Sequence, residues 1–155
     1  MRALLVGLLV LGAIAGCGPE IDYLADPTEA PVEPDGGVDG PVVFSRDIRP
    51  LMSRADGPTT FGCKRCHYPG EPDPQGLQLG GLDLSSLGSL RRGGISSGQS
   101  IVIAGNPDGS ALVQKLEGRY ARGARMPKDR TPWSAAEIAL VRRWIQEGAR
   151  GTDQE

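Results

Sequence analysis

The hydrophobic positions of the chain fall into one continuous run near the N-terminus and three separate amphipathic segments. The run covers residues 3–14, twelve apolar or small residues that follow the positive charge of Arg2. Twelve residues are too few to span a bilayer comfortably, and this length is typical of a signal-peptide core rather than a membrane helix. A small-residue cleavage site fits before residue 17, so we expect residues 1–16 to be a signal peptide.

The first amphipathic segment, 44–55, predicts a helix with one apolar face. Phe44, Ile48 and Met52 are spaced four residues apart and therefore share a side. Asp47 is the expected N-cap, which puts Pro50 at the third helical position, where its missing N–H costs nothing.

The second segment, 107–118, predicts a short helix that starts at Asp108 or Ser110 and ends at Gly118. The third, 132–149, is the clearest element of the chain. Ser134 and Glu137 have the spacing of a capping box, and Gly148 marks the end of a helix of about 13 residues.

The connections between these segments, 68–81 and 91–109, are rich in glycine and predict irregular structure. The leucines of "GGLDLSSLGSL" between them follow neither a strand nor a helix period, which predicts irregular structure or a short helix near 85–90. The chain has 23 Gly and 13 Pro but only 5 % aromatic residues. Such a composition does not fill a large core by itself, and a metal, a covalent staple or a bulky cofactor would help it to fold. Long loops of this kind inside a small domain usually carry function or wrap a cofactor.

Charge divides the rest of the chain into two parts. Residues 18–41 hold seven acidic residues, no basic ones, five Pro and four Gly, which predicts a disordered tether. Residues 42–155 hold 16 Lys and Arg against 12 Asp and Glu, a net charge of +4 that the whole-chain value of −2 conceals. A mildly basic domain of this kind, without interleaved aromatic residues, does not indicate nucleic-acid binding.

The densest chemistry lies in "CKRCH", which contains Cys63, Cys66 and His67, the only histidine of the chain. This C-x-x-C-H spacing is the attachment signature of c-type haem. Two intervening residues let both thiols reach the vinyl groups along one porphyrin edge, and the next residue then falls under the iron. The same cysteines could instead hold zinc or act in thiol redox chemistry. Zinc needs further ligands, however, and thioredoxin-type chemistry needs a βαβ setting, for which the sequence gives no sign.

A haem iron with one histidine ligand leaves a second axial position. Met126 lies in the polar segment "GARMPKDRTP" and is the expected ligand, because an isolated methionine has no core to join there. Met52 is expected in the core, and an open site remains the alternative.

The segments just described resemble the planctomycete-type cytochrome c domain, a branch of the class I cytochromes c, over about residues 42–151. The motifs that carry the resemblance are "FSRDIRPLMS", "CKRCH", "GGLDLSSLGSLRRGG", "IVIAGNPDGSALVQKL", "ARMP" and "WSAAEIALVRRWIQEGA". The resemblance implies one covalent haem c on Cys63 and Cys66, with His67 proximal and Met126 distal. It also implies an all-α fold, a small cytochrome c-like domain with few helices and long Gly-rich loops around one haem, in which the N-terminal helix crosses the C-terminal one.

The segment "IAGC" resembles the lipobox of bacterial lipoproteins, which implies lipidation of Cys17 and residues 17–41 as a membrane tether. Gly18 after the cysteine favours the outer membrane, on its periplasmic or cell-surface side. We therefore expect an electron carrier between exported redox proteins rather than an enzyme. A basic cluster around Met126 is expected to meet haem propionates or an acidic partner: Arg119, Arg122, Arg125, Lys128 and Arg130. A peroxidase-like enzyme, a gas or redox sensor and a haem-stabilised binding lipoprotein are the alternatives.

Overall fold

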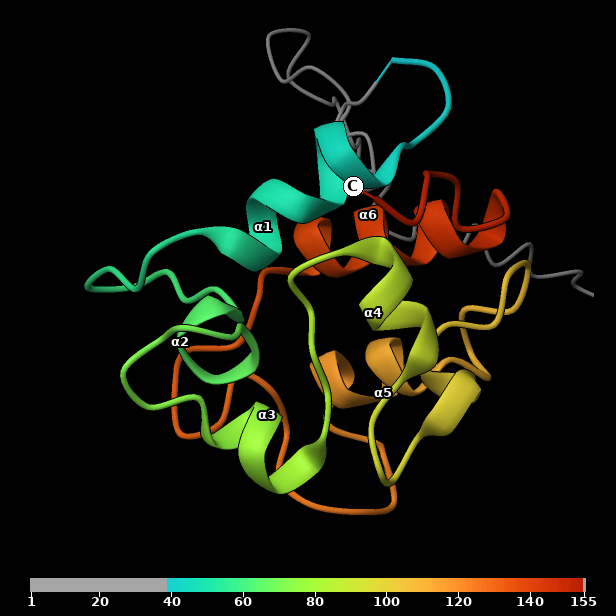
Figure 1. Cartoon of the computed structure of the whole chain (residues 1–155). Coiled ribbons are helices and arrows are strands. Elements are labelled where there is room, and N and C mark those ends of the chain that lie inside the picture. The colour runs from blue at the N-terminus through green and yellow to red at the C-terminus, as the bar shows by residue number, and fades with distance from the viewer. Residues whose placement is uncertain (1–38, 155) are drawn as a thin grey trace, which may run out of the picture. The chain divides into compact units, whose positions relative to one another are not determined.

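The computed structural model describes residues 39–154, and every regular element within this range is helical (Figure 1). The expected all-α class is therefore confirmed for the described part of the chain. The predicted signal peptide, Cys17 and the tether up to residue 38 lie outside the described residues. The elements are η1 (Phe44–Ile48), α1 (Arg49–Ser53), α2 (Lys64–His67), α3 (Gln75–Gly80), α4 (Leu87–Arg92), η2 (Gly98–Ile101), α5 (Ala111–Glu117) and α6 (Ala135–Gln146).

The first helical segment starts earlier than its sequence predicts. A π-helical turn, η1, begins directly at Phe44 and continues into α1, so the prediction of Asp47 as N-cap is wrong. The Asp47 carboxylate instead accepts a hydrogen bond from the backbone N–H of Val43, four residues earlier, at 2.8 Å. Pro50 lies in the first turn of α1, directly after the π-helical turn, and has no N–H to donate to a carbonyl of that turn.

The core lies between this first segment and the C-terminal helix. The rings of Phe44 and Trp144 are in tilted contact, with centroids 5.6 Å apart, and both side chains are fully buried. The indole N–H of Trp144 donates to the carbonyl of Arg150 at 2.9 Å, so its burial leaves no unpaired polar group. Helices η1 and α6 thus lie against each other, with α5 also against α6 (Figure 1).

The two later helices follow their sequence signals closely. Ser134 and Glu137 form the predicted capping box of α6, and Gly148, with a φ of 98°, follows its last turn. Helix α5 starts after Ser110 and ends at Gly118, whose φ of 77° is unfavourable for residues with a side chain. The hydroxyl of Ser110 does not cap the helix; it donates to the carbonyl of Asn106 and accepts from the N–H of Ile103.

The Gly-rich connections contain more regular structure than expected. Helix α4 confirms the predicted short helix near 85–90, with Ser86 and Ser89 forming its capping box. Helix α3 and the 3-10 turn η2 were expected to be irregular, and that expectation is wrong. Within residues 39–154, no helix is both long and apolar enough to cross a membrane.

Candidate cofactor-binding site

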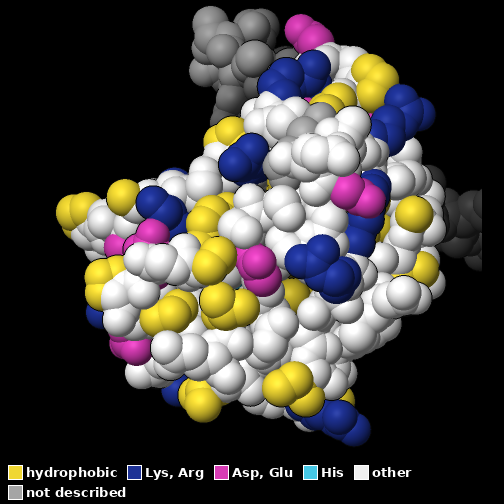
Figure 2. Space-filling model, viewed as in Figure 1, with side chains coloured by type: hydrophobic (Ala, Val, Ile, Leu, Met, Phe, Trp, Pro, Cys, Tyr) yellow, Lys and Arg dark blue, Asp and Glu magenta, His cyan; other side chains and the backbone are white. Residues whose placement is uncertain are grey.

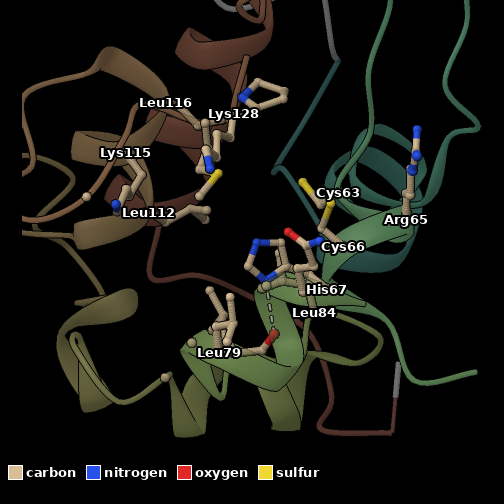
Figure 3. A pocket seen from close by; sticks show the side chains of 18 of the residues that line it. Cys63, Arg65, Cys66, His67, Leu79, Leu84, Leu112, Lys115, Leu116 and Lys128 are labelled. Atoms are coloured by element: carbon tan, nitrogen blue, oxygen red, sulfur yellow. Dashed lines mark hydrogen bonds between the residues drawn. The ribbon is translucent and has the colours of Figure 1, made fainter. Parts of the chain in front are cut away.

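The reactive residues that the sequence analysis identified line one cavity of about 670 Å³. It is enclosed by α2, α3, α5 and the loops around them, and its wall includes Cys63, Cys66, His67 and Met126. These residues come from two segments that are about 60 positions apart in the sequence. Figure 3 shows the His67 ring between the two cysteines and the side chains of Leu112 and Leu116.

His67 is the last residue of α2 and is buried, with a fractional exposure of 9 %. Its Nδ1 lies 3.0 Å from the carbonyl oxygen of Leu82, drawn as a dashed line in Figure 3. A carbonyl only accepts, so Nδ1 carries the proton and Nε2 keeps its lone pair when the ring is neutral. Burial lowers the pKa of His67, and the positive charge of Lys115 lowers it further. The hydrogen bond to Leu82 acts in the opposite direction but does not outweigh burial. The ring is therefore neutral, with an unprotonated Nε2 that is able to bind a metal ion.

The segment that follows α2 folds back over the histidine. The backbone N–H of Leu84 donates to the carbonyl of His67 at 3.0 Å, two residues beyond the Leu82 carbonyl that accepts from the ring. Gly76 of α3 lies against the imidazole itself: a Cβ atom built there would be 2.5 Å from the ring Cε1. Sequence reasoning missed both Leu82 and Gly76. The motif "GGLDL" is the only signal near Leu82, and it was interpreted as irregular structure.

The two cysteines are free thiols in different surroundings. Cys63 is partly buried, and its backbone N–H donates to the carbonyl of Met52 at 2.7 Å. Burial raises the pKa of the Cys63 thiol to about 12. Cys66 lies on the exposed side of α2. A thiol with a pKa this high stays protonated at neutral pH, which argues against Cys63 as a thiolate nucleophile.

A zinc site gains no support from the arrangement of donor residues. Among residues 39–154, no three His, Cys, Asp or Glu side chains lie close enough together to hold a metal ion. A structural zinc ion takes four such ligands. The nitrogen of His67 and the thioether of a methionine are instead a donor pair that haem iron accepts.

The two methionines of the described region have different surroundings. Met126 is partly buried in the cavity wall, and its backbone N–H donates to the carbonyl of Lys115 on α5 at 3.0 Å. Met52 is fully buried in the hydrophobic core and is not part of the cavity wall. Of the two, only Met126 therefore shares a cavity with His67, and Met52 takes the packing position expected for it.

The remaining wall of the cavity is mostly apolar. Aliphatic side chains contribute from the loop after α3, from η2 and from α5: Leu82, Leu84, Ile101, Ala111, Leu112 and Leu116. Leu79 of α3 also lines the cavity although 78 % of its surface is exposed. A wall of this kind, with a few convergent polar groups, suits a largely apolar planar ligand.

Basic residues surround the cavity, but not all of the cluster predicted around Met126 faces it. Arg122, Lys128 and Arg130 line the cavity, together with Arg65 and Lys115. Arg119 is instead paired with Asp108 and Glu117, and Arg125 donates to the carbonyl of Leu116 at 2.7 Å. On the face seen in Figure 2, positive and negative side chains are interspersed rather than gathered into one patch.

The loop before Cys63 is fastened to the start of α6. Two guanidinium nitrogens of Arg54 and the indole N–H of Trp133 all donate to the carbonyl of Phe61, at 2.8–3.1 Å. Arg54 also pairs with Glu137, the capping residue of α6, and lies 5.1 Å above the Trp133 ring. Phe61 and Cys63 both line the cavity, so this cluster holds one of its walls in place. No sequence motif indicates the part that Trp133 takes in this cluster.

A scan against models of known protein families gave no match to the chain, and searches of characterised proteins and of solved structures gave none either.

Proposed function

We propose that this protein is a mono-haem c-type cytochrome that carries single electrons between exported redox partners. Haem c would be held by thioethers to Cys63 and Cys66, with His67 and Met126 as axial ligands. The observation that carries the proposal is that all four residues line the same cavity, although Met126 is 59 positions beyond His67.

The cavity fits such a group in size and in chemistry. Its volume of about 670 Å³ lies within the range of roughly 300–1,000 Å³ that is usual for cofactor and ligand sites. The aliphatic wall suits the face of a porphyrin, and the neutral His67 ring with its free Nε2 suits the iron. Both cysteines are free thiols rather than a disulfide, as thioether formation requires.

When bound, the haem would supply a one-electron couple between Fe(II) and Fe(III). The surrounding residues of the chain would set the reduction potential of this couple. A methionine ligand opposite a histidine raises the reduction potential, and the apolar wall keeps water away from the site. The Leu82 carbonyl holds the His67 ring and fixes its tautomer, so that the same nitrogen always faces the cavity.

The basic residues of the cavity wall would meet the haem carboxylates or an acidic partner. Lys115 is fixed by hydrogen bonds from its ammonium group to the carbonyls of Arg122 and Ala124, at 2.6 and 3.1 Å. Burial lowers the pKa of Lys115. Charges fixed at a cavity mouth also speed the approach of an oppositely charged protein.

The membrane attachment is part of the same proposal. Cleavage before Cys17 and its lipidation would tether the domain to the outer membrane through residues 17–41. The electron donor and acceptor would then be proteins of the periplasm or cell surface.

The test is an optical spectrum of the full chain after co-expression with c-type haem maturation. We expect the absorption of a six-coordinate c-type haem with a weak red sulfur-to-iron band. Met126→Leu should remove that band and lower the reduction potential, because leucine has no donor atom. Met52→Leu is the matched control, because it makes the same change in the core, where shape-conserving exchanges are tolerated.

Each outcome has a separate meaning. A red band that survives in Met126→Leu contradicts the assignment of Met126, because another sulfur, such as that of Met52, would then be the ligand. A wild-type haem spectrum without the red band also contradicts it and favours an open site, as in an enzyme or a sensor. A chain without covalent haem contradicts the proposal as a whole and leaves Cys63 and Cys66 as a thiol pair.

A further inference from the structure

Gly76 occupies a place in α3 where the backbone does not require glycine. Its φ is not positive, so any residue could adopt its conformation. Glycine inside a helix is less favourable than alanine because it loses more backbone entropy on folding. The reason for glycine at this position therefore has to be sought in the space around it.

That space is filled by the imidazole of His67. A Cβ atom at position 76 would be 2.5 Å from Cε1, 2.6 Å from Nε2 and 2.8 Å from Nδ1 of the ring. Real Cβ atoms do not approach other atoms this closely, so either the helix or the ring would have to move. The ring has little freedom, because it is buried and hydrogen-bonded to Leu82.

We propose that Gly76 is a positioning residue for His67, and that its missing side chain lets α3 lie against the imidazole and fix the ring plane. The Leu82 carbonyl holds the ring at Nδ1, and the α3 backbone lies beside the ring atoms. Together these two contacts set the direction of Nε2. The inference rests on the proposed function only in so far as Nε2 is taken to bind haem iron.

The chain provides a matched control within the same helix. Gly80 closes α3, its φ is also not positive, and a Cβ atom there would meet nothing within 4 Å. Gly76→Ala and Gly80→Ala therefore make the same chemical change in one helix, and only the first puts a methyl group against His67.

The experiment compares the full haem-loaded chain with these two variants. Intact mass gives the covalent haem content, and the g values of the ferric state together with the hyperfine-shifted haem methyl resonances report the plane of the axial imidazole. We expect Gly76→Ala to shift the g values and the methyl pattern, and Gly80→Ala to match the wild type. If Gly76→Ala also matches the wild type in both signatures, the inference is overturned.

A second measurement applies even where Gly76→Ala does not accumulate with haem. Thermal unfolding is measured for Gly76→Ala in two backgrounds of the full haem-free chain. The wild type contains the His67 ring, and His67→Ala lacks it. We expect Gly76→Ala to lower Tm by about 5 °C or more when the ring is present and to leave Tm unchanged or raised in His67→Ala. An equal fall in both backgrounds overturns the inference, because the cost would then not come from the ring. If the proposed function is wrong, the wild-type chain will carry no covalent haem, which is a different result. The unfolding comparison uses haem-free protein and so does not depend on the proposed function.

Discussion

The two cysteine side chains of the cavity differ in their surroundings, although only Lys64 and Arg65 separate them. Cys63 lies partly buried beside the loop that Arg54 holds, whereas Cys66 lies on the exposed side of α2. Cys63 is the residue before α2 and is bound through its N–H to the carbonyl of Met52, whereas Cys66 lies within the helix and faces outward. A reagent in solution should therefore distinguish the two thiols.

We predict that Cys63 is much the slower of the two to react with iodoacetamide in the full, reduced, haem-free chain. A rise of its pKa from 9.0 to about 12 lowers the thiolate fraction near pH 8 about a thousandfold. Cleavage after Lys64 and Arg65 separates the two cysteines, so that peptide mass mapping follows each one. In urea the protection of Cys63 should disappear. Protection that persists in urea, or equal rates in the folded chain, would contradict the burial of Cys63.

Single residues also show which parts of the site a sequence reveals. Cys63, Cys66 and His67 were predicted because their spacing is itself a chemical signature. Leu82 and Gly76 act on the same ring, but the first does so with a backbone carbonyl and the second with a missing side chain. Any residue has a backbone carbonyl, and glycine is common in loops and turns. A sequence motif therefore reveals neither contribution.

At the scale of elements, the loop before Cys63 depends on the first turn of α6. Glu137 closes the capping box with Ser134 and also pairs with Arg54, which in turn holds the carbonyl of Phe61. Burial would raise the pKa of Glu137, but hydrogen bonds from Arg54 and Ser134 outweigh it, so the pKa lies below its ordinary value of 4.5. The capping of one helix and the position of a cavity wall are thus linked through a single carboxylate.

We predict that the stabilisation by the Glu137 charge is lost in acid. A lowered folded-state pKa means that the contribution is complete above about pH 4.5 and disappears as the pH falls through the folded value. Glu137→Gln keeps a capping side chain without the charge. Thermal unfolding should therefore show the variant less stable than the wild type at pH 7, with the difference shrinking towards pH 3. A difference that does not change with pH would contradict the charge pairing with Arg54.

The elements also show where sequence patterns stop being informative. Helix α6 was predicted almost to the residue, because its cap, its apolar face and its stop all agree. Helix α3 was not predicted. None of its residues is buried, so its sequence needs no hydrophobic periodicity and shows none. Asp47 was predicted as a cap because its residue type is typical of one, but the helical segment continues upstream into a π-helical turn that no simple periodicity predicts.

At the scale of the whole molecule, a cavity of about 670 Å³ lies inside a described region of only 116 residues. Small domains bury a modest share of their surface, and a space of this size removes contacts from the residues that line it. Buried side chains such as Phe44 and Trp144 fill the core between η1 and α6, whereas residues of α2, α3 and α5 line the cavity. Stability should therefore depend on what fills it.

We predict that haem loading raises Tm by about 10 °C or more, a stabilisation of roughly 2–3 kcal/mol for a domain of this size. The comparison is between the full chain produced with and without c-type haem maturation. The double variant Cys63→Ala/Cys66→Ala is the control, because it should melt like the haem-free chain under both conditions. An equal Tm for the loaded and haem-free wild type would mean that the cavity does not limit stability.

The fastening of the N-terminal segment has a mechanical consequence. Gly40 and Val42 are bound to α6 through Arg143 and Glu147, and the N–H of Phe44 donates to the carbonyl of Arg150. A force applied to the chain before Gly40 is therefore borne first by hydrogen bonds to the C-terminal helix and to the segment after it. Such a force would reach the loops that carry Cys63 and Met126 only after it had passed these hydrogen bonds. A pull on the segment before Gly40 would thus load the η1–α6 side first, and it would reach the loops around the cavity only after these hydrogen bonds had broken.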